Sequence, residues 1–225
     1  MTAEDSGTMR NGDNASVDGP FARTPRAVIF DIGSVIVRVN VGRARSVAGG
    51  GGKHSPEQIW AAIEADPLWS DWQTGKIEPR EWYRHLTQAF GTGLDFSAFT
   101  DAWNRVLEPE PIIDDELFRA LAPRCRLALL SNTDPLHVAY MEKNFSFMRY
   151  FPVRIYSCRV GACKPAPEIY LRALQELGIA AGEALYIDDL EKNVEAARKV
   201  GMLGFRFTGV GALKDELRGL GLLST

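Results

Sequence analysis

Four places along the sequence carry side chains that could cooperate in phosphate chemistry: Asp31, Ser131, Lys164 and the adjacent pair Asp188 and Asp189. Three carboxylates around one point repel each other unless a cation lies between them, and hard oxygen ligands of this kind suit Mg²⁺. Ser131 and nearby turn amides could hold phosphate oxygens, while Lys164 could stabilise developing negative charge. A carboxylate in this setting can attack phosphorus, and water can then hydrolyse the aspartyl-phosphate.

The elements around these residues predict how they could meet. Asp31, Ser131 and Asp188 each follow a short apolar run that is typical of a buried strand. Such strands alternate with helical segments, which indicates an α/β fold: a Rossmann-like parallel sheet with helices on both faces. Ligands bind such sheets outside the carboxyl ends of the strands. The expected strands are 27–30, 127–130, 155–157, 184–187 and 204–207, and the expected helices are 114–121, 165–178 and 191–200.

Residues 40–110 break this alternation and are expected to form an all-helical insertion. Ser55 to Gln58 form a capping box with proline at the first helical position. A second helix is predicted from Pro79 to the stop at Gly91, and a third around residues 99–107. The expected organisation is a disordered tail over 1–22, a core made of 23–39 and 111–225, and the insertion between them.

Composition narrows the function classes. The 225 residues carry a net charge of −3, which gives no reason to expect nucleic acid or an anionic membrane as a partner.

The sequence also bears on location. No apolar run is long enough to span a membrane, the start lacks a secretory h-region, and a reduced cytoplasmic location is expected. The histidines lack ligand spacing and are interpreted as surface or packing residues, and no oligomeric state is indicated. The three cysteines form no Cys-x-x-Cys pair; they are Cys125, Cys158 and Cys163.

Four short segments, taken in order, resemble the motifs of the haloacid dehalogenase-like (HAD) hydrolase superfamily. The resemblance covers nearly all of residues 27–208, and the helical insertion is similar to the helical (C1) cap of that family. The segments are FDIGSV at 30–35, LSNT at 130–133, KP at 164–165 and IDD at 187–189.

The resemblance implies a role for each residue at these positions. The downstream segment NVEAA, at 193–197, favours Asp189 as the direct metal ligand, with Asp188 acting directly or through water. The implied roles are Asp31 as nucleophile and metal ligand, the Gly33 carbonyl as a second ligand, Ser131 and Asn132 as phosphate-binding residues, Lys164 as the group that steadies Asp31 and phosphate, and Asp188 and Asp189 as the remaining metal residues.

Gly33 departs from the family pattern. Most phosphatases of the family carry an Asp at this position as the general acid and base, and glycine has no side chain to transfer a proton. A subset with Asp-x-Gly in the first motif resembles bacterial sugar-phosphate phosphatases, so activity is still expected. Because general acid catalysis is worth about 10²–10⁴-fold, we predict a slow or substrate-selective enzyme that takes its proton from water or a cap residue. Gly33 could also simply serve a tight turn.

The function predicted from these residues is Mg²⁺-dependent removal of phosphate from a small phosphorylated metabolite, possibly a sugar phosphate, through an aspartyl-phosphate on Asp31. Two alternatives stay open: a metal-independent haloacid dehalogenase, and a weakly catalytic or non-catalytic binding protein. The cap is expected to close over the site and select the substrate. Its candidate pocket residues are Trp69, Trp72, His85 and Trp103.

Overall fold

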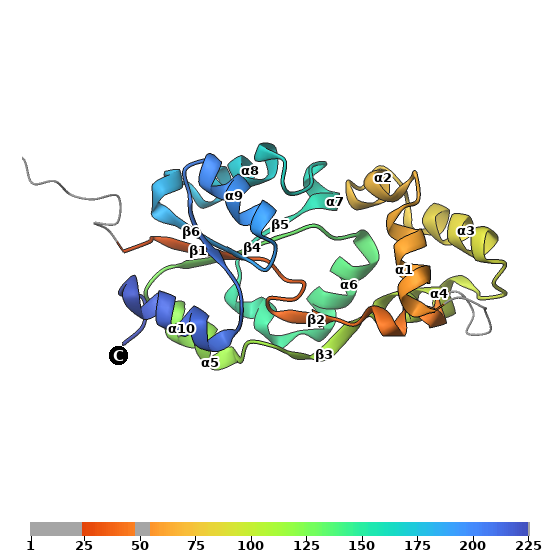
Figure 1. Ribbon diagram of the computed structural model, residues 1–225, viewed down its shortest axis with the longest axis horizontal. Helices are drawn as coiled ribbons and strands as arrows, with labels where there is room; N and C mark the ends of the chain where they lie inside the picture. The colour runs from red at the N-terminus through yellow and green to blue at the C-terminus, as the bar shows by residue number, and fades with distance from the viewer. Residues whose placement is uncertain (1–23, 48–54, 225) are drawn as a thin grey trace, which may run out of the picture.

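A five-stranded parallel sheet forms the centre of the molecule (Figure 1). The structure is a computed structural model that describes residues 24–47 and 55–224; the expected tail over 1–22 lies outside these residues. The strand order is β5-β4-β1-β6-β7, so the predicted parallel sheet is confirmed. The strands are β1 (Ala27–Phe30), β4 (Arg126–Ser131), β5 (Val153–Tyr156), β6 (Ala184–Asp188) and β7 (Leu203–Arg206).

Helices cover both faces of this sheet. Successive side chains of the central strand β1 point to opposite faces, and since all of them are apolar, both faces must be shielded from water. Val28 and Phe30 belong to one apolar core, and Ala27 and Ile29 belong to the other. The first core is closed by α5 (Asp115–Leu121), α6 (Pro135–Asn144) and α10 (Val210–Gly219). The second is closed by α8 (Pro167–Leu177) and α9 (Glu191–Lys199). Shorter helical turns are α7 (Ser157–Val160), η1 (Val41–Ser46), η2 (Ser146–Tyr150) and η3 (Ala181–Glu183).

Four helices gather at one end of the molecule and are called the helical block here (Figure 1). Its apolar core is separate from the two cores of the sheet and contains Trp72, Trp82 and Trp103, each with no exposed surface. The predicted capping box is present, since Ser55 and Gln58 cap the first helix reciprocally. The helices are α1 (Pro56–Glu64), α2 (Trp69–Gln73), α3 (Pro79–Phe90) and α4 (Phe96–Asn104).

A two-stranded antiparallel ribbon connects this block to the sheet. It pairs β2 (Val37–Val39) with β3 (Leu107–Pro111), and the Asn40 N–H donates to the Val106 carbonyl at 2.7 Å. The expectation that 40–110 is entirely helical is therefore wrong at its end, because α4 stops at Asn104 and the chain then extends. The prolines of β3 prevent helix continuation. No helix in the described residues is both long and apolar enough to cross a bilayer.

Candidate active site

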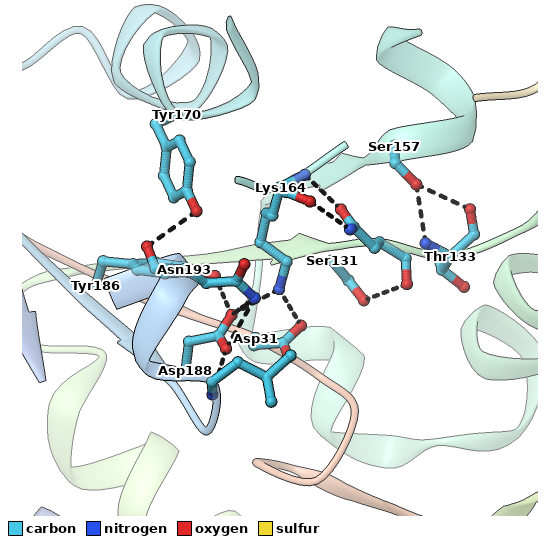
Figure 2. Close-up of polar contacts among 11 residues, drawn as sticks. Asp31, Ser131, Thr133, Ser157, Lys164, Tyr170, Tyr186, Asp188 and Asn193 are labelled. Atoms are coloured by element: carbon cyan, nitrogen blue, oxygen red, sulfur yellow. Dashed lines mark hydrogen bonds and ion pairs between the residues drawn. The ribbon is translucent and has the colours of Figure 1, made fainter. Parts of the chain in front are cut away.

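The carboxyl ends of β1, β4 and β6 bring the predicted residues to one rim of the sheet (Figure 2). Asp31 follows β1, Ser131 ends β4 and Asp188 ends β6. All three side chains are buried. Lys164 reaches this rim from the loop between α7 and α8, so Asp31 and Lys164, which are 133 positions apart in the sequence, lie within hydrogen-bonding distance.

Lys164 joins two of the carboxylates. Its Nζ lies 2.7 Å from Asp31 Oδ1 and 2.7 Å from Asp188 Oδ2. Burial alone would lower the pKa of Lys164, but the two carboxylates outweigh burial and raise it, so the side chain stays charged. Asn132 positions the lysine: its Oδ1 accepts from the Lys164 N–H at 2.7 Å, and its Nδ2 donates to the Lys164 carbonyl at 3.0 Å. The Asn132 side chain thus braces the Lys164 backbone.

The Asp188 carboxylate is saturated with hydrogen-bond donors. Besides Lys164, it accepts from the Tyr186 hydroxyl, from the Leu190 N–H at 2.9 Å, and from Asn193 Nδ2 at 3.0 and 3.1 Å to its two oxygens. A carboxylate offers about four lone-pair sites, and these donors use them. Asp188 therefore anchors Lys164 from a fully buried position.

The carboxylates of Asp31, Asp188 and Asp189 form a group whose ligand oxygens all lie within 4.8 Å of one another. Burial raises the pKa of Asp31 to about 6; Lys164 opposes this rise and the Asp188 charge adds to it. Burial and the neighbouring Asp188 also raise the pKa of Asp189. Crowded, partly dehydrated carboxylates of this kind fit a hard divalent cation, which would offset their repulsion.

Two hydrogen bonds to Ser157 fix the loop that follows β4. The Thr133 N–H donates to Ser157 Oγ at 2.9 Å, and the Ser157 hydroxyl donates back to the Thr133 carbonyl at 3.0 Å (Figure 2). Within the described part of the chain, the Ser131 hydroxyl makes only a long contact of 3.4 Å to the Asn132 carbonyl, so a stronger acceptor could replace this contact.

Gly33 is not required by the backbone. The positive φ in this turn belongs to Ser34, at 59°, and Gly33 is not among the glycines with positive φ. A Cβ on Gly33 would lie 3.4 Å from Val39 Cγ2, which is ordinary van der Waals contact. The interpretation of Gly33 as a glycine demanded by a tight turn is therefore not supported.

A cavity of about 130 Å³ lies between this rim and the helical block. Gly33, Ser131 and Thr133 line it from the sheet, and Trp60, Glu64, Trp69 and Gln73 line it from the helical block. Of the four pocket residues predicted from the sequence, Trp69 is on the wall.

The other three pocket predictions are corrected. Trp72 and Trp103 have no exposed surface and pack in the core of the helical block, stacked on Trp82 and Phe99 respectively. His85 lies away from the cavity wall and pairs with Asp66 at 2.7 Å.

The sequence analysis also missed a buried ion pair beside the cavity. The Asp134 carboxylate lies 2.8 Å from His137 Nδ1 and accepts from Trp103 Nε1 at 3.1 Å. His137 Nε2 lies 3.1 Å from the Trp103 carbonyl. Both ring nitrogens face acceptors, which favours the imidazolium form of His137. Burial alone would lower the His137 pKa, but its pair with Asp134 raises it. Asp134 is also the N-cap of α6. The sequence does carry a signal for α6, because Pro135 directly follows Asp134, but the sequence analysis predicted no helix there.

Known proteins resemble most of the chain. The sequence is 26% identical over 198 residues to the sesquiterpene phosphatase astK of Aspergillus oryzae, which covers 88% of this chain and 97% of that protein. It is 22% identical to a D-ribitol-5-phosphate phosphatase of Bacteroides thetaiotaomicron, covering 80% of this chain and 90% of that protein.

The fold agrees with these relatives. A HAD family enzyme of B. thetaiotaomicron, crystallised with magnesium and inorganic phosphate, superposes with a TM-score of 0.74 at 24% identity, covering 83% of this chain and 96% of that one. The family model for haloacid dehalogenase-like hydrolases matches residues 25–201. The resemblance of the four motifs is confirmed: this chain is an enzyme of the haloacid dehalogenase-like hydrolase family.

Proposed function

We propose that this enzyme is a Mg²⁺-dependent phosphomonoesterase that acts on a small phosphorylated metabolite through Asp31. The observation that carries the proposal is the juxtaposition of a buried carboxylate–lysine–carboxylate contact with a third carboxylate beside a cavity. The acidic group favours metal-dependent phosphate chemistry over a metal-independent dehalogenase, because a dehalogenase has no use for three crowded carboxylates.

Each residue has a part in this proposal. Asp31 is the nucleophile, and Lys164 orients it and adds a positive charge for the phosphoryl oxygens. Asp31, Asp189 and the Gly33 carbonyl would hold the magnesium ion, since the Asp188 oxygens are already used by donors. When bound, the ion supplies positive charge to a phosphate oxygen. Ser131 and the main-chain N–H of Asn132 would complete the phosphate site.

The cavity suggests the kind of substrate. Trp60 and Trp69 give it an aromatic wall, and Glu64 and Gln73 add polar groups that could bind hydroxyls. Relatives of this chain include a D-ribitol-5-phosphate phosphatase and a sesquiterpene phosphatase. A sugar or polyol phosphate of modest size fits this mixture best, and we propose that the segment 40–110 acts as the cap that closes over it.

Phosphate release tests this function directly. Purified protein with Mg²⁺ should release phosphate from at least one member of a panel of sugar, polyol and nucleotide phosphates, and a chelator should abolish the release. Halide release from 2-haloacids that survives the chelator would instead support the dehalogenase. Binding of Mg²⁺ and phosphate without turnover on any substrate would support a binding protein.

Magnesium should also stabilise the fold. An ion that binds only the native state at about 100 times its dissociation constant adds about 2.7 kcal/mol to the free energy of unfolding. We expect Mg²⁺ to raise the melting temperature of the wild type, and Asp189→Asn to remove most of that rise while leaving the metal-free melting temperature nearly unchanged. Asp215→Asn, which changes an exposed carboxylate of α10, is the matched control. An undiminished response in Asp189→Asn would contradict this assignment.

A further inference from the structure

Gly33 leaves the site without the side chain that would transfer protons, so another group must protonate the leaving alcohol or the enzyme must rely on water. The structure assigns this role to Glu64, and we propose that its carboxyl group is the general acid and base of the reaction. The assignment rests on the phosphatase function proposed above and adds a catalytic residue from the helical block.

The titratable groups on the cavity wall leave one candidate. They are Glu64, Asp134 and His137. Asp134 Oδ1 accepts two N–H groups of α6, and Oδ2 accepts from Trp103 and His137, so no lone pair is left. Both ring nitrogens of His137 are hydrogen-bonded, so this imidazolium has no proton to offer to a substrate.

Glu64 is different, because among the residues that the structure describes only its Oε1 atom has a hydrogen-bond partner. Trp60 Nε1 donates to Glu64 Oε1 at 2.9 Å, across one turn of α1. The same helix buries Ile59 and Ile63 in the core of the helical block, and this burial fixes the rotation of α1 about its own axis. Trp60 and Glu64 thereby line the same cavity as Gly33, with Glu64 on its exposed side. The indole contact orients the carboxyl group, and Oε2 stays available.

The proton balance closes without another reactant. Protonated Glu64 gives its proton to the leaving oxygen as that oxygen–phosphorus bond breaks and the Asp31 oxygen–phosphorus bond forms. The Glu64 carboxylate then takes a proton from water, whose oxygen attacks phosphorus and releases Asp31. Glu64 is protonated again at the end of the cycle.

The leaving group supplies the test. A good leaving group departs as an anion and needs no acid, whereas a poor one does. With Mg²⁺ present, kcat/KM is measured for 4-nitrophenyl phosphate and 4-methylphenyl phosphate in the wild type and in Glu64→Gln, which keeps an acceptor for Trp60. We expect the variant to stay within about twofold on the nitrophenyl ester and to lose about 10²-fold on the methylphenyl ester.

Controls separate this role from others. Glu81→Gln, an exposed glutamate of α3 outside the cavity wall, should leave both rates unchanged. An equal loss on both esters in Glu64→Gln would show a binding or structural role and overturn the proposal, as would no loss on either. Turnover that survives Asp31→Asn, or a wild type that is inactive on both esters and on the whole panel of sugar, polyol and nucleotide phosphates, would instead reject the phosphatase function on which the proposal rests.

Discussion

Asp31→Asn should abolish turnover, with kcat/KM falling by about 10⁴-fold or more, a loss typical of removing an enzyme's nucleophile. The amide has nearly the shape of the carboxylate and can still accept from Lys164, but it cannot form the covalent phosphoenzyme. The loss should therefore appear for every substrate, independent of its leaving group. A phosphate-release assay with the best substrate of the panel measures it.

The same substitution should leave the fold intact. Burial raises the pKa of Asp31 to about 6, so the ionised carboxylate opposes folding of the metal-free protein at neutral pH. Asp31→Asn removes that charge, and its metal-free melting temperature should equal or exceed that of the wild type. Acid-quenched wild type should carry phosphate on the tryptic peptide spanning 27–38, and the variant should not. Activity within tenfold of the wild type would exclude Asp31 as the nucleophile.

Asp134→Ala should have the largest effect on stability, lowering the free energy of unfolding by about 3–5 kcal/mol. The substitution leaves the His137 imidazolium buried without its carboxylate, and it removes the N-cap of α6. It also removes the acceptor of Trp103 Nε1, so α4 of the helical block loses a contact with the sheet domain. Urea denaturation at pH 6 measures the difference.

The effect of Asp134→Ala should depend on pH in both directions. The Asp134 pKa is lowered overall by His137 although burial alone would raise it, so this stabilisation is present above the unfolded value of about 3.9 and is lost as pH falls through the folded pKa. The His137 pKa is raised, so its contribution is complete below about 6.5 and is lost as pH rises through the folded pKa. The gap between wild type and variant should be widest between these limits.

The pair of Asp66 and His85 is the matched control for Asp134→Ala. It has the same chemistry at 2.7 Å, but the His85 side chain is 34% exposed. Solvent screens such a pair, so Asp66→Ala should lower the free energy of unfolding by about 1 kcal/mol or less through the pair itself. Equal losses in the two variants would show that burial does not decide the contribution of Asp134.

The rim of the sheet was predictable because its signals are local. An apolar run that ends in a polar residue marks both a buried strand and its carboxyl end, and parallel strands place those ends together. Asp31, Ser131 and Asp188 follow this rule. Lys164 does not end a strand, and it was predicted from the KP segment at 164–165. The helices at 79–90 and 167–177 were also readable, because Gly91 and Gly178 end them in the left-handed conformation.

The cavity wall was not predictable because it depends on how helices pack. Trp60, Trp69, Trp72 and Trp103 are all aromatic residues at helical spacing, and the sequence does not say which face meets the sheet. The strand β3 of the ribbon was not predicted because its sequence contains two prolines, which are rare in strands away from an edge. The role of Asp134 depends on residues 31 positions away on α4, which no local pattern reveals.

The antiparallel ribbon has a consequence for how substrate preference can change. Val39 and Leu107 are register partners, so the chain leaves for the helical block and returns from it at neighbouring positions. A segment whose two ends are adjacent can be exchanged for another without moving the strands that carry the catalytic groups. Grafting a different insertion between 39 and 107 should thus change selectivity while Asp31, Lys164 and Asp189 stay in place on the host, and the new insertion would have to supply its own group in place of Glu64.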